Sequence, residues 1–412
     1  MVLLSLGRTA LLTKNLPIDD YGRILVVMNF FGFLAMFFGL RVNDFIYRFF
    51  PQFKEQQEYA ELKGILFISF ALSLIVGLIV SLGTYAASCW IAQTFYNDQA
   101  YVPLFRIYAL AAFFIAFEGF YTAILRLQDR FVLIVVPQVA GASVSLVVIA
   151  TYILYFGPLS IKFAVWSITA GILVTTLPAL FLSLLYIRPI ILRSDGFGLL
   201  SLKNHRKRII SNLFQTNLTG YLKLGSDTGG MFLLGVLATP TQVALYGIAR
   251  QLAKVLQIMQ NNIQNAITPE IVSLWAQEKI KQLYGLVNGY TRWSLITGAA
   301  ISITAVLISK PAILIFTTPE YLEALPVFYV FIFTIYLTFV SLVFFPLALA
   351  MDKLAQRNLI VSIRIVYLLI GAIIGLNAMV LATVQLLGAL TTRLFNDIPL
   401  LRNLRRLAIS AS

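Results

Sequence analysis

The chain has 412 residues, of which 59% are hydrophobic and 12% charged, and its formal net charge at pH 7 is +14. The charged share is about half of that in soluble globular proteins, and apolar stretches of membrane-spanning length recur along the whole chain, which excludes a soluble fold. A single cysteine, Cys89, excludes an internal disulfide, and a single histidine, His205, excludes a metal cluster built on histidines.

Apolar runs bounded by proline, glycine, asparagine, aspartate and charged clusters predict twelve membrane helices. In chain order these cover residues 1–13, 20–47, 62–94, 100–126, 130–155, 161–192, 206–237, 241–272, 282–316, 321–351, 355–376 and 379–405. The first is shorter than the roughly 20 residues that a span needs, so we expect it to be clipped or to enter the bilayer incompletely. The N-terminus lacks the basic region and cleavage site of a secretory signal and is interpreted as mature sequence.

Lysine and arginine concentrate in alternate loops, as topology requires. Three lie on one side (Lys14, Lys162 and Lys310), whereas 18 lie on the other. This asymmetry supports an even number of helices and predicts that the 194–205 loop and the C-terminus are cytoplasmic. Because topology explains the positive net charge, binding to nucleic acid is not needed to account for it.

The two halves of the chain share landmarks in the same order, spaced 218 to 225 residues apart. The pairs are Tyr21-Gly22 with Tyr246-Gly247, Phe50-Pro51 with Thr268-Pro269, Phe95-Tyr96 with Phe316, and Asp129-Arg130 with Asp352-Lys353. Such spacing predicts a duplicated six-helix unit whose two copies face the same way. The predicted domains are an N-terminal bundle at 1–193, a cytoplasmic linker at 194–205 and a C-terminal bundle at 206–412.

Charged residues inside the predicted spans are mostly basic, and each costs at least about 2.5 to 3.5 kcal/mol if it faces lipid near the bilayer centre. The ten bases are Arg8, Arg23, Arg41, Arg106, Lys223, Arg250, Lys254, Arg292, Arg364 and Arg393, and the four acids are Asp44, Glu118, Asp227 and Asp397. These side chains are therefore expected to face one another, water or the headgroup zone.

Polar residues recur at three- and four-residue steps, which places them on single helix faces. The stripes are Gln215, Thr219, Lys223 and Asp227 on the seventh helix; Arg250, Lys254, Gln257, Asn261, Gln264 and Asn265 on the eighth; and Arg41, Asp44 and Arg48 on the second. The second and eighth helices are equivalent under the repeat. We therefore expect these faces to meet across a central, wet, net-positive cavity.

Simpler interpretations compete with a binding role at several of these sites. Lys223 with Asp227, and Arg41 with Asp44, are also spaced as neutralising intrahelical pairs that hold helices together. Arg23, Arg292 and Arg364 lie near span ends, from which long side chains reach the headgroups. Arg250 and Lys254 have no acid within a turn on their own helix, which favours a substrate anion as their partner.

Several segments resemble the polysaccharide transporter, or lipid-linked oligosaccharide (O-antigen-type) flippase, family of the multidrug/oligosaccharidyl-lipid/polysaccharide (MOP) exporter superfamily. The matching segments are Ser226-Asp227, Leu234-Gly235, Ala244 to Ala249, Ile267 to Glu270, Asp20-Tyr21-Gly22, Gly39-Leu40, Arg48 to Pro51, and Phe316 to Tyr321 with Ala324. The resemblance implies an all-α polytopic membrane protein with two six-helix bundles in a V, alternating between inward- and outward-open states. It also implies that the protein flips an undecaprenyl-pyrophosphate-linked oligosaccharide or a related glycan.

The expected substrate site follows from the stripes and the resemblance together. Arg41, Lys223, Arg250 and Lys254 are expected to bind the diphosphate, and Gln257 and Asn261 the sugars. The acids Asp44, Glu118, Asp227 and Asp397 are candidates for pairing or for carrying a coupling H⁺ or Na⁺. No metal or organic cofactor is expected. The expected partners are the bilayer of a bacterial inner membrane, the lipid-pyrophosphate-linked glycan and enzymes of polysaccharide assembly.

Three other functions remain open at this point. A multidrug or other small-molecule exporter of the same superfamily shares the fold, but it would favour an acidic pocket, whereas the bases in the spans outnumber the acids ten to four. A membrane glycan polymerase, ligase or acyltransferase needs catalytic side chains grouped at an interface or on a large external loop, and the external loops here are short. No nucleophile, phosphate-loop or dinucleotide motif is visible, so no enzyme activity is expected. A scaffold or degenerate homologue is the third.

Overall fold

The structure, a computed structural model, describes residues 2–39, 41–193 and 228–410. Throughout these ranges the chain forms helices and short connections, without a β-strand. Nine helical segments within the same ranges are long and apolar enough to cross a membrane. The predicted all-α polytopic membrane fold is therefore confirmed.

The chain divides into two compact units, unit 1 (Met1–Leu224) and unit 2 (Gly225–Ser412). The border between them falls outside the described residues, so the predicted linker at 194–205 stays a prediction. His205, Lys223, Asp227 and the rest of the stripe on the seventh helix lie outside the described residues as well.

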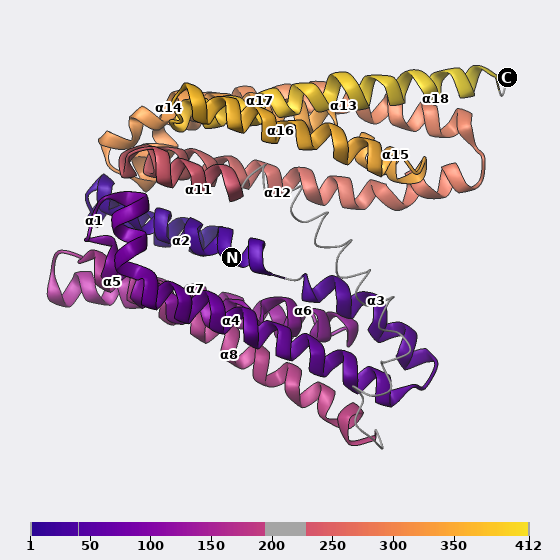
Figure 1. Cartoon of the computed structure of the whole chain (residues 1–412). Helices are drawn as coiled ribbons and strands as arrows, with labels where there is room; N and C mark the ends of the chain where they lie inside the picture. The colour runs from indigo at the N-terminus through magenta and orange to yellow at the C-terminus, as the bar shows by residue number, and fades with distance from the viewer. Residues whose placement is uncertain (1, 40, 194–227, 411–412) are drawn as a thin grey trace. The chain divides into compact units, whose positions relative to one another are not determined.

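Unit 1 contains the six predicted spans in order (Figure 1). Its helices are α1 (Val2–Asn15), α2 (Ile18–Phe38), α3 (Val42–Glu55), α4 (Tyr59–Tyr96), α5 (Tyr101–Ile115), α6 (Glu118–Leu127), α7 (Val132–Phe156) and α8 (Ile161–Arg193). The second span is divided into α2 and α3, and the fourth into α5 and α6. Helix α4 packs on α5, α5 on α8, and α7 on α8.

Unit 2 repeats this order of elements from its second span onward. Its elements are α11 (Thr228–Leu237), α12 (Pro240–Ala276), α13 (Ile280–Phe316), η2 (Pro319–Ala324), α14 (Leu325–Val340), α15 (Phe344–Ala350), α16 (Leu354–Ile374), α17 (Ala378–Thr392), η3 (Arg393–Asp397) and α18 (Ile398–Ser410). Helices α12 and α13 and the α17–α18 segment run lengthwise through the unit (Figure 1).

Turns at matching positions of the two halves have the same backbone conformation. Gln57 and Glu278 are both left-handed, with φ of 58° and 56°, and so are Asp129 and Asp352, with φ of 55° and 54°. In each turn the next amide donates to the carbonyl five residues earlier, at 2.8 to 3.0 Å, which is the Schellman way of ending a helix. The same turn at matching positions of both halves supports the predicted duplication.

Aromatic and aliphatic side chains fill equivalent positions in the two units. In unit 1, Phe45 and Phe49 of α3 are fully buried in a cluster with residues of α4, α6 and α8. In unit 2, Ile267 and Ile271 of α12 are buried in a cluster with residues of α13, α15 and α18. Helices α3 and the C-terminal part of α12 are therefore held firmly at one end of their own units, which fixes the direction in which their remaining faces point.

Helices α7 and α8 approach closely because glycines meet at their crossing. A Cβ atom added at Gly171 would lie 2.6 Å from the carbonyl oxygen of Gly141 and 2.9 Å from the Cβ of Ser145. Neither distance is possible without movement of the backbone or of the neighbouring helix. Small residues at such crossings are what allow membrane helices to pack without a hydrophobic driving force.

We therefore expect Gly171→Val to lower the stability of unit 1 by about 1–3 kcal/mol through overpacking. Gly83→Val in α4 is the matched control, because nothing lies within 4 Å of its added Cβ. Thermal unfolding of the two purified variants in the same detergent measures the difference. Equal melting temperatures would contradict the close crossing.

Candidate functional site

The second span is interrupted in the middle by a break between Phe38 and Val42. Gly39 ends α2 with its amide bonded to the carbonyl of Ala35 (2.8 Å), and Arg41 is left-handed with φ of 42°. The sequence predicts one continuous helix over 20–47, and this prediction is wrong at the break. A side chain at position 39 would collide with the Ala35 carbonyl oxygen, so the conformation requires glycine.

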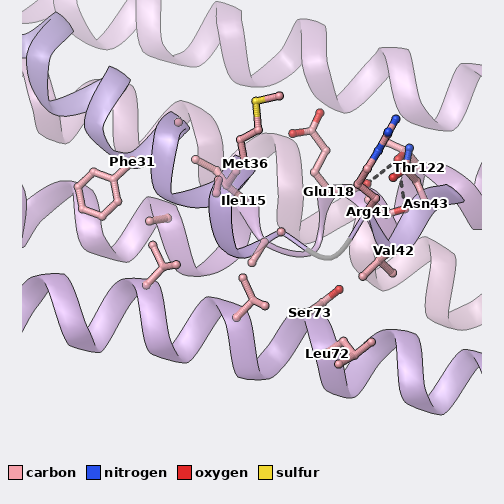
Figure 2. Close-up of a pocket in the computed structure, with 18 of the residues that line it drawn as sticks. Phe31, Met36, Arg41, Val42, Asn43, Leu72, Ser73, Ile115, Glu118 and Thr122 are labelled. Atoms are coloured by element: carbon pink, nitrogen blue, oxygen red, sulfur yellow. Dashed lines mark hydrogen bonds between the residues drawn. The ribbon is translucent and has the colours of Figure 1, made fainter. Parts of the chain in front are cut away.

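A pocket of about 560 Å³ lies at this break, within unit 1 (Figure 2). It is formed by α2, α3, α4, α5 and α6, and most of its wall is apolar, with Phe31, Met36, Leu72 and Ile115 among the lining residues. Its polar side chains are Arg41, Asn43, Ser73, Tyr108, Glu118 and Thr122. The pocket thus combines an apolar wall with a small number of polar groups, as ligand sites do.

The charges at the pocket are not those of a simple anion site. The Nε of Arg41 lies 2.9 Å from Oδ2 of Asp44, and both side chains are about one-third exposed. This contact is the neutralising intrahelical pair that the spacing of Arg41 and Asp44 also predicts. Glu118, exposed at the first position of α6, has no lysine or arginine of the described chain within 4.0 Å. With Arg41 already beside an acid, Glu118 gives the pocket an acidic excess.

A second polar surface lies on α12 in unit 2. Lys254, Gln257 and Asn261 are exposed and Arg250 is half-buried, so the predicted stripe occupies one outward face of the helix. Helix α12 has 37 residues, about 55 Å at 1.5 Å per residue, yet it is too polar to qualify among the nine apolar spans of the described chain. A helix of this kind in a membrane protein has to turn its polar face toward protein or water.

The neighbouring, buried face of α12 is fixed inside unit 2 by a pair of hydrogen bonds. Gln260 is 8% exposed, and its Nε2 donates to the carbonyl oxygen of Thr338 in α14 (2.9 Å). The hydroxyl of Thr338 donates back to Oε1 of Gln260 (3.1 Å). Because this buried amide is anchored, the face that carries Arg250 and Lys254 keeps a fixed direction relative to α14.

Whereas Glu118 lines the pocket of unit 1, Asp397 is buried in unit 2. It is 1% exposed and ends the π-helical turn η3, where its Oδ2 lies 3.8 Å from Nη1 of Arg393 and its Oδ1 accepts from Nδ2 of Asn396 (2.8 Å). The guanidinium groups of Arg393 and Arg357 lie over the rings of Phe344 and Phe345, each at 5.0 Å. The sequence marks Asp397 as an acid for pairing or for ion coupling, and the structure places it beside Arg393 of the same segment.

The structure shows the surroundings of Arg23 and Arg364, two of the three bases that the sequence places near span ends. Arg23 reaches the connection between α4 and α5, where it pairs with Asp98 (2.8 Å) as well as Asp20 (3.1 Å). The interpretation of Arg364 as a side chain that extends to the headgroups is wrong. Its Nε is buried, and its Cδ would lie 2.6 Å from a Cβ at Gly388, so the side chain crosses α17 inside unit 2.

Comparisons with known proteins agree on family and fold. Residues 2–275 match the family model described as "Polysaccharide biosynthesis protein". No curated protein sequence matches the chain.

Three solved structures illustrate the likeness of fold. An inward-facing multidrug resistance MATE family transporter of the MOP superfamily has a TM-score of 0.75 at 15% identity, over 98% of this chain and 95% of that chain. The lipid II flippase MurJ, in an inward closed conformation, has a TM-score of 0.71 at 13% identity, over 99% and 88%. A MOP superfamily transporter from Pyrococcus furiosus, described as having a binding pocket of reverse polarity, has a TM-score of 0.61 at 15% identity, over 97% and 91%.

Proposed function

Since the chain belongs to the polysaccharide biosynthesis protein family and has the fold of the MOP superfamily transporters, we propose that this membrane transporter is a flippase for lipid-linked oligosaccharide or polysaccharide precursors. It moves the precursor across a bacterial inner membrane by alternating access, with the 194–205 loop and the C-terminus in the cytoplasm. A gradient of H⁺ or Na⁺ supplies the driving force, and no covalent chemistry is involved. Enzymes that assemble the polysaccharide supply and remove the substrate.

The observation that carries this proposal is the exposed basic face of α12. Arg250 and Lys254 lie on it, and no acid occurs in the helix from residue 250 to residue 265. A lipid diphosphate offers the anionic oxygens that guanidinium and ammonium groups bind most strongly, through charge-assisted hydrogen bonds. Gln257 and Asn261 continue the same face with amides suited to hydroxyl-bearing sugars.

A small-molecule exporter is the second candidate, because Glu118 gives the pocket of unit 1 an acidic excess. A carboxylate in a mostly apolar pocket attracts an organic cation. The fold does not separate the two candidates, since both a MATE transporter and a lipid flippase resemble this chain.

Transport by the reconstituted full-length protein separates the two functions. Vesicles are prepared with a fluorescent polyprenyl-diphosphate disaccharide in the membrane, and a membrane-impermeant reductant then reports the fraction that has moved between leaflets. Parallel vesicles contain a cationic dye, and empty vesicles give the background of both assays. We expect movement of the lipid-linked sugar well above background and no movement of the dye. Dye movement without lipid movement would overturn the flippase proposal in favour of the exporter.

A further inference from the structure

The pocket at the α2–α3 break differs in charge and shape from the basic face of α12, which suggests a separate task. We propose that this pocket binds one or two sugar rings of the glycan, with Glu118, Asn43 and Thr122 as hydrogen-bonding partners. The inference rests on the proposed flippase function and adds a site for the sugar part of the substrate. It assigns recognition of the sugar to a pocket within unit 1.

The charge of the pocket argues against phosphate as its ligand. Arg41 is its basic residue, and Asp44 already lies 2.9 Å from the Arg41 guanidinium. Glu118 adds a carboxylate without a base of the described chain within 4.0 Å. A phosphate in the same pocket would meet this acid, and like charges repel. Sugar hydroxyls, in contrast, donate to a carboxylate in charge-assisted hydrogen bonds.

Polar groups around the break are positioned for a ligand that both donates and accepts hydrogen bonds. Ser73 is 1% exposed, and its hydroxyl is directed toward the break and has no hydrogen-bond partner among the described residues (Figure 2). The first amides of α3, at Val42 and Asn43, have no acceptor within their own helix. The hydroxyl of Thr122 donates to the carbonyl of Glu118, so its lone pairs stay available to an incoming donor.

Ser73 of α4 adds a hydroxyl just beneath the wall of the pocket. A buried hydroxyl without a partner costs about 1–3 kcal/mol, and rotation of the Ser73 side chain toward the pocket would let a sugar hydroxyl supply the missing bond. Sugar rings carry hydroxyls on their edges and C–H groups on their faces. The apolar faces fit against Phe31 and Tyr108, which line the same pocket.

The size of the pocket distinguishes a sugar from a bound ion. Its volume of about 560 Å³ lies within the range of about 300–1,000 Å³ that is typical of sites for small organic ligands. One water molecule occupies about 30 Å³ of liquid, so a single ion would leave most of this space to water. A ligand with several ring atoms and several hydroxyls uses both the space and the polar groups.

Protection of a single cysteine tests the assignment in the full-length protein in nanodiscs. Cys89 is the one cysteine of the chain and is exposed on α4 outside the pocket, so Met36→Cys in a Cys89→Ser background places a reporter thiol in the pocket wall. The rate of labelling by a small thiosulfonate reagent is measured with cellobiose or N,N′-diacetylchitobiose at millimolar concentration. We expect at least one of the two disaccharides to slow the labelling of this reporter thiol severalfold. Labelling of the native Cys89 in the unaltered chain should not change.

The carboxylate is tested by Glu118→Gln, which keeps the size of the side chain and removes its charge. Replacing a charge-assisted bond by a neutral one should raise the sugar concentration needed for protection about tenfold. Glu55→Gln, at an exposed acid of α3 outside the pocket, is the matched control and should leave protection unchanged.

Three outcomes would overturn the inference: no protection by either disaccharide, equal protection of Cys89, or protection by NaCl but not by sugar, which would indicate a hydrated cation instead. Flipping by the Arg250→Ala/Lys254→Ala variant separates this failure from that of the proposed function. If that variant loses flipping while sugars give no protection, the pocket assignment fails alone. If the lipid-linked substrate does not move even with the unaltered protein, the flippase proposal fails as well.

Discussion

Replacing Arg250 and Lys254 together by alanine is expected to reduce the flipping of a lipid-diphosphate-linked sugar by a factor of about 100 or more. Both side chains lie on the outward face of α12, four residues apart and therefore on the same side of the helix. Each charge-assisted bond to a phosphate is worth about 1.5–3 kcal/mol, and every 1.4 kcal/mol is a factor of ten in binding. The initial rate of leaflet exchange in reconstituted vesicles, at substrate levels well below saturation, measures this loss.

The matched control for this variant is Lys279→Ala/Lys281→Ala, which removes the same net charge from exposed positions at the start of α13. It should flip at nearly the unaltered rate. Arg250→Lys should fall between the two, because an ammonium group keeps the charge but loses the two-pronged geometry of a guanidinium. An unaltered rate in the double alanine variant would remove the basic face of α12 from the substrate site.

Asp397→Ala is expected to destabilise unit 2 by about 3–5 kcal/mol, the usual result of removing one partner of a buried ion pair. The carboxylate is 1% exposed and is the acid nearest to Arg393, at 3.8 Å, in the described part of unit 2. Without it, the partly buried guanidinium of Arg393 would keep its charge and lose its counter-charge. Thermal or denaturant unfolding of the purified protein in detergent measures the change.

Two comparisons show whether the lost counter-charge is the cause. Glu323→Ala removes an exposed acid of the same unit and should change the melting temperature very little. Adding Arg393→Met to Asp397→Ala should recover part of the lost stability, because the uncompensated charge is then absent. A double variant less stable than Asp397→Ala would show that Arg393 contributes mainly through its packing over Phe344.

Local periodicity is what made much of the architecture predictable. The stripe from Arg250 to Asn261 follows a three-four rhythm that only a helix turns into a single face, and the structure places these side chains on one outward face of α12. The paired turns at Asp129 and Asp352 could be found in the sequence because an acid before a base ends an apolar run in both halves.

Features that depend on several helices were beyond the reach of the sequence. The pocket brings together Ser73 of α4, Thr122 of α6 and Asn43 of α3, and none of these residues is distinctive within its own segment. The packing of Arg364 against α17 depends on Gly388, 24 residues further along the chain on another helix. The break at Gly39 had a local signal, which is a glycine after an aromatic run. Apolar residues continue on both sides of this glycine, however, so the sequence predicts one continuous helix.

The interruption between α2 and α3 has a mechanical consequence that its counterpart α12 does not share. No proline interrupts the hydrogen-bond ladder of α12 between Pro240 and Pro269, so this stretch, which carries Arg250 and Asn261, tilts as one stiff rod. Gly39 and Arg41 lie outside α2 and α3, so the ladder does not run from one helix into the other, and a tilt of α3 need not be transmitted to α2. Equivalent segments of the two halves therefore differ in stiffness, because α12 is one helix and its counterpart is divided into α2 and α3.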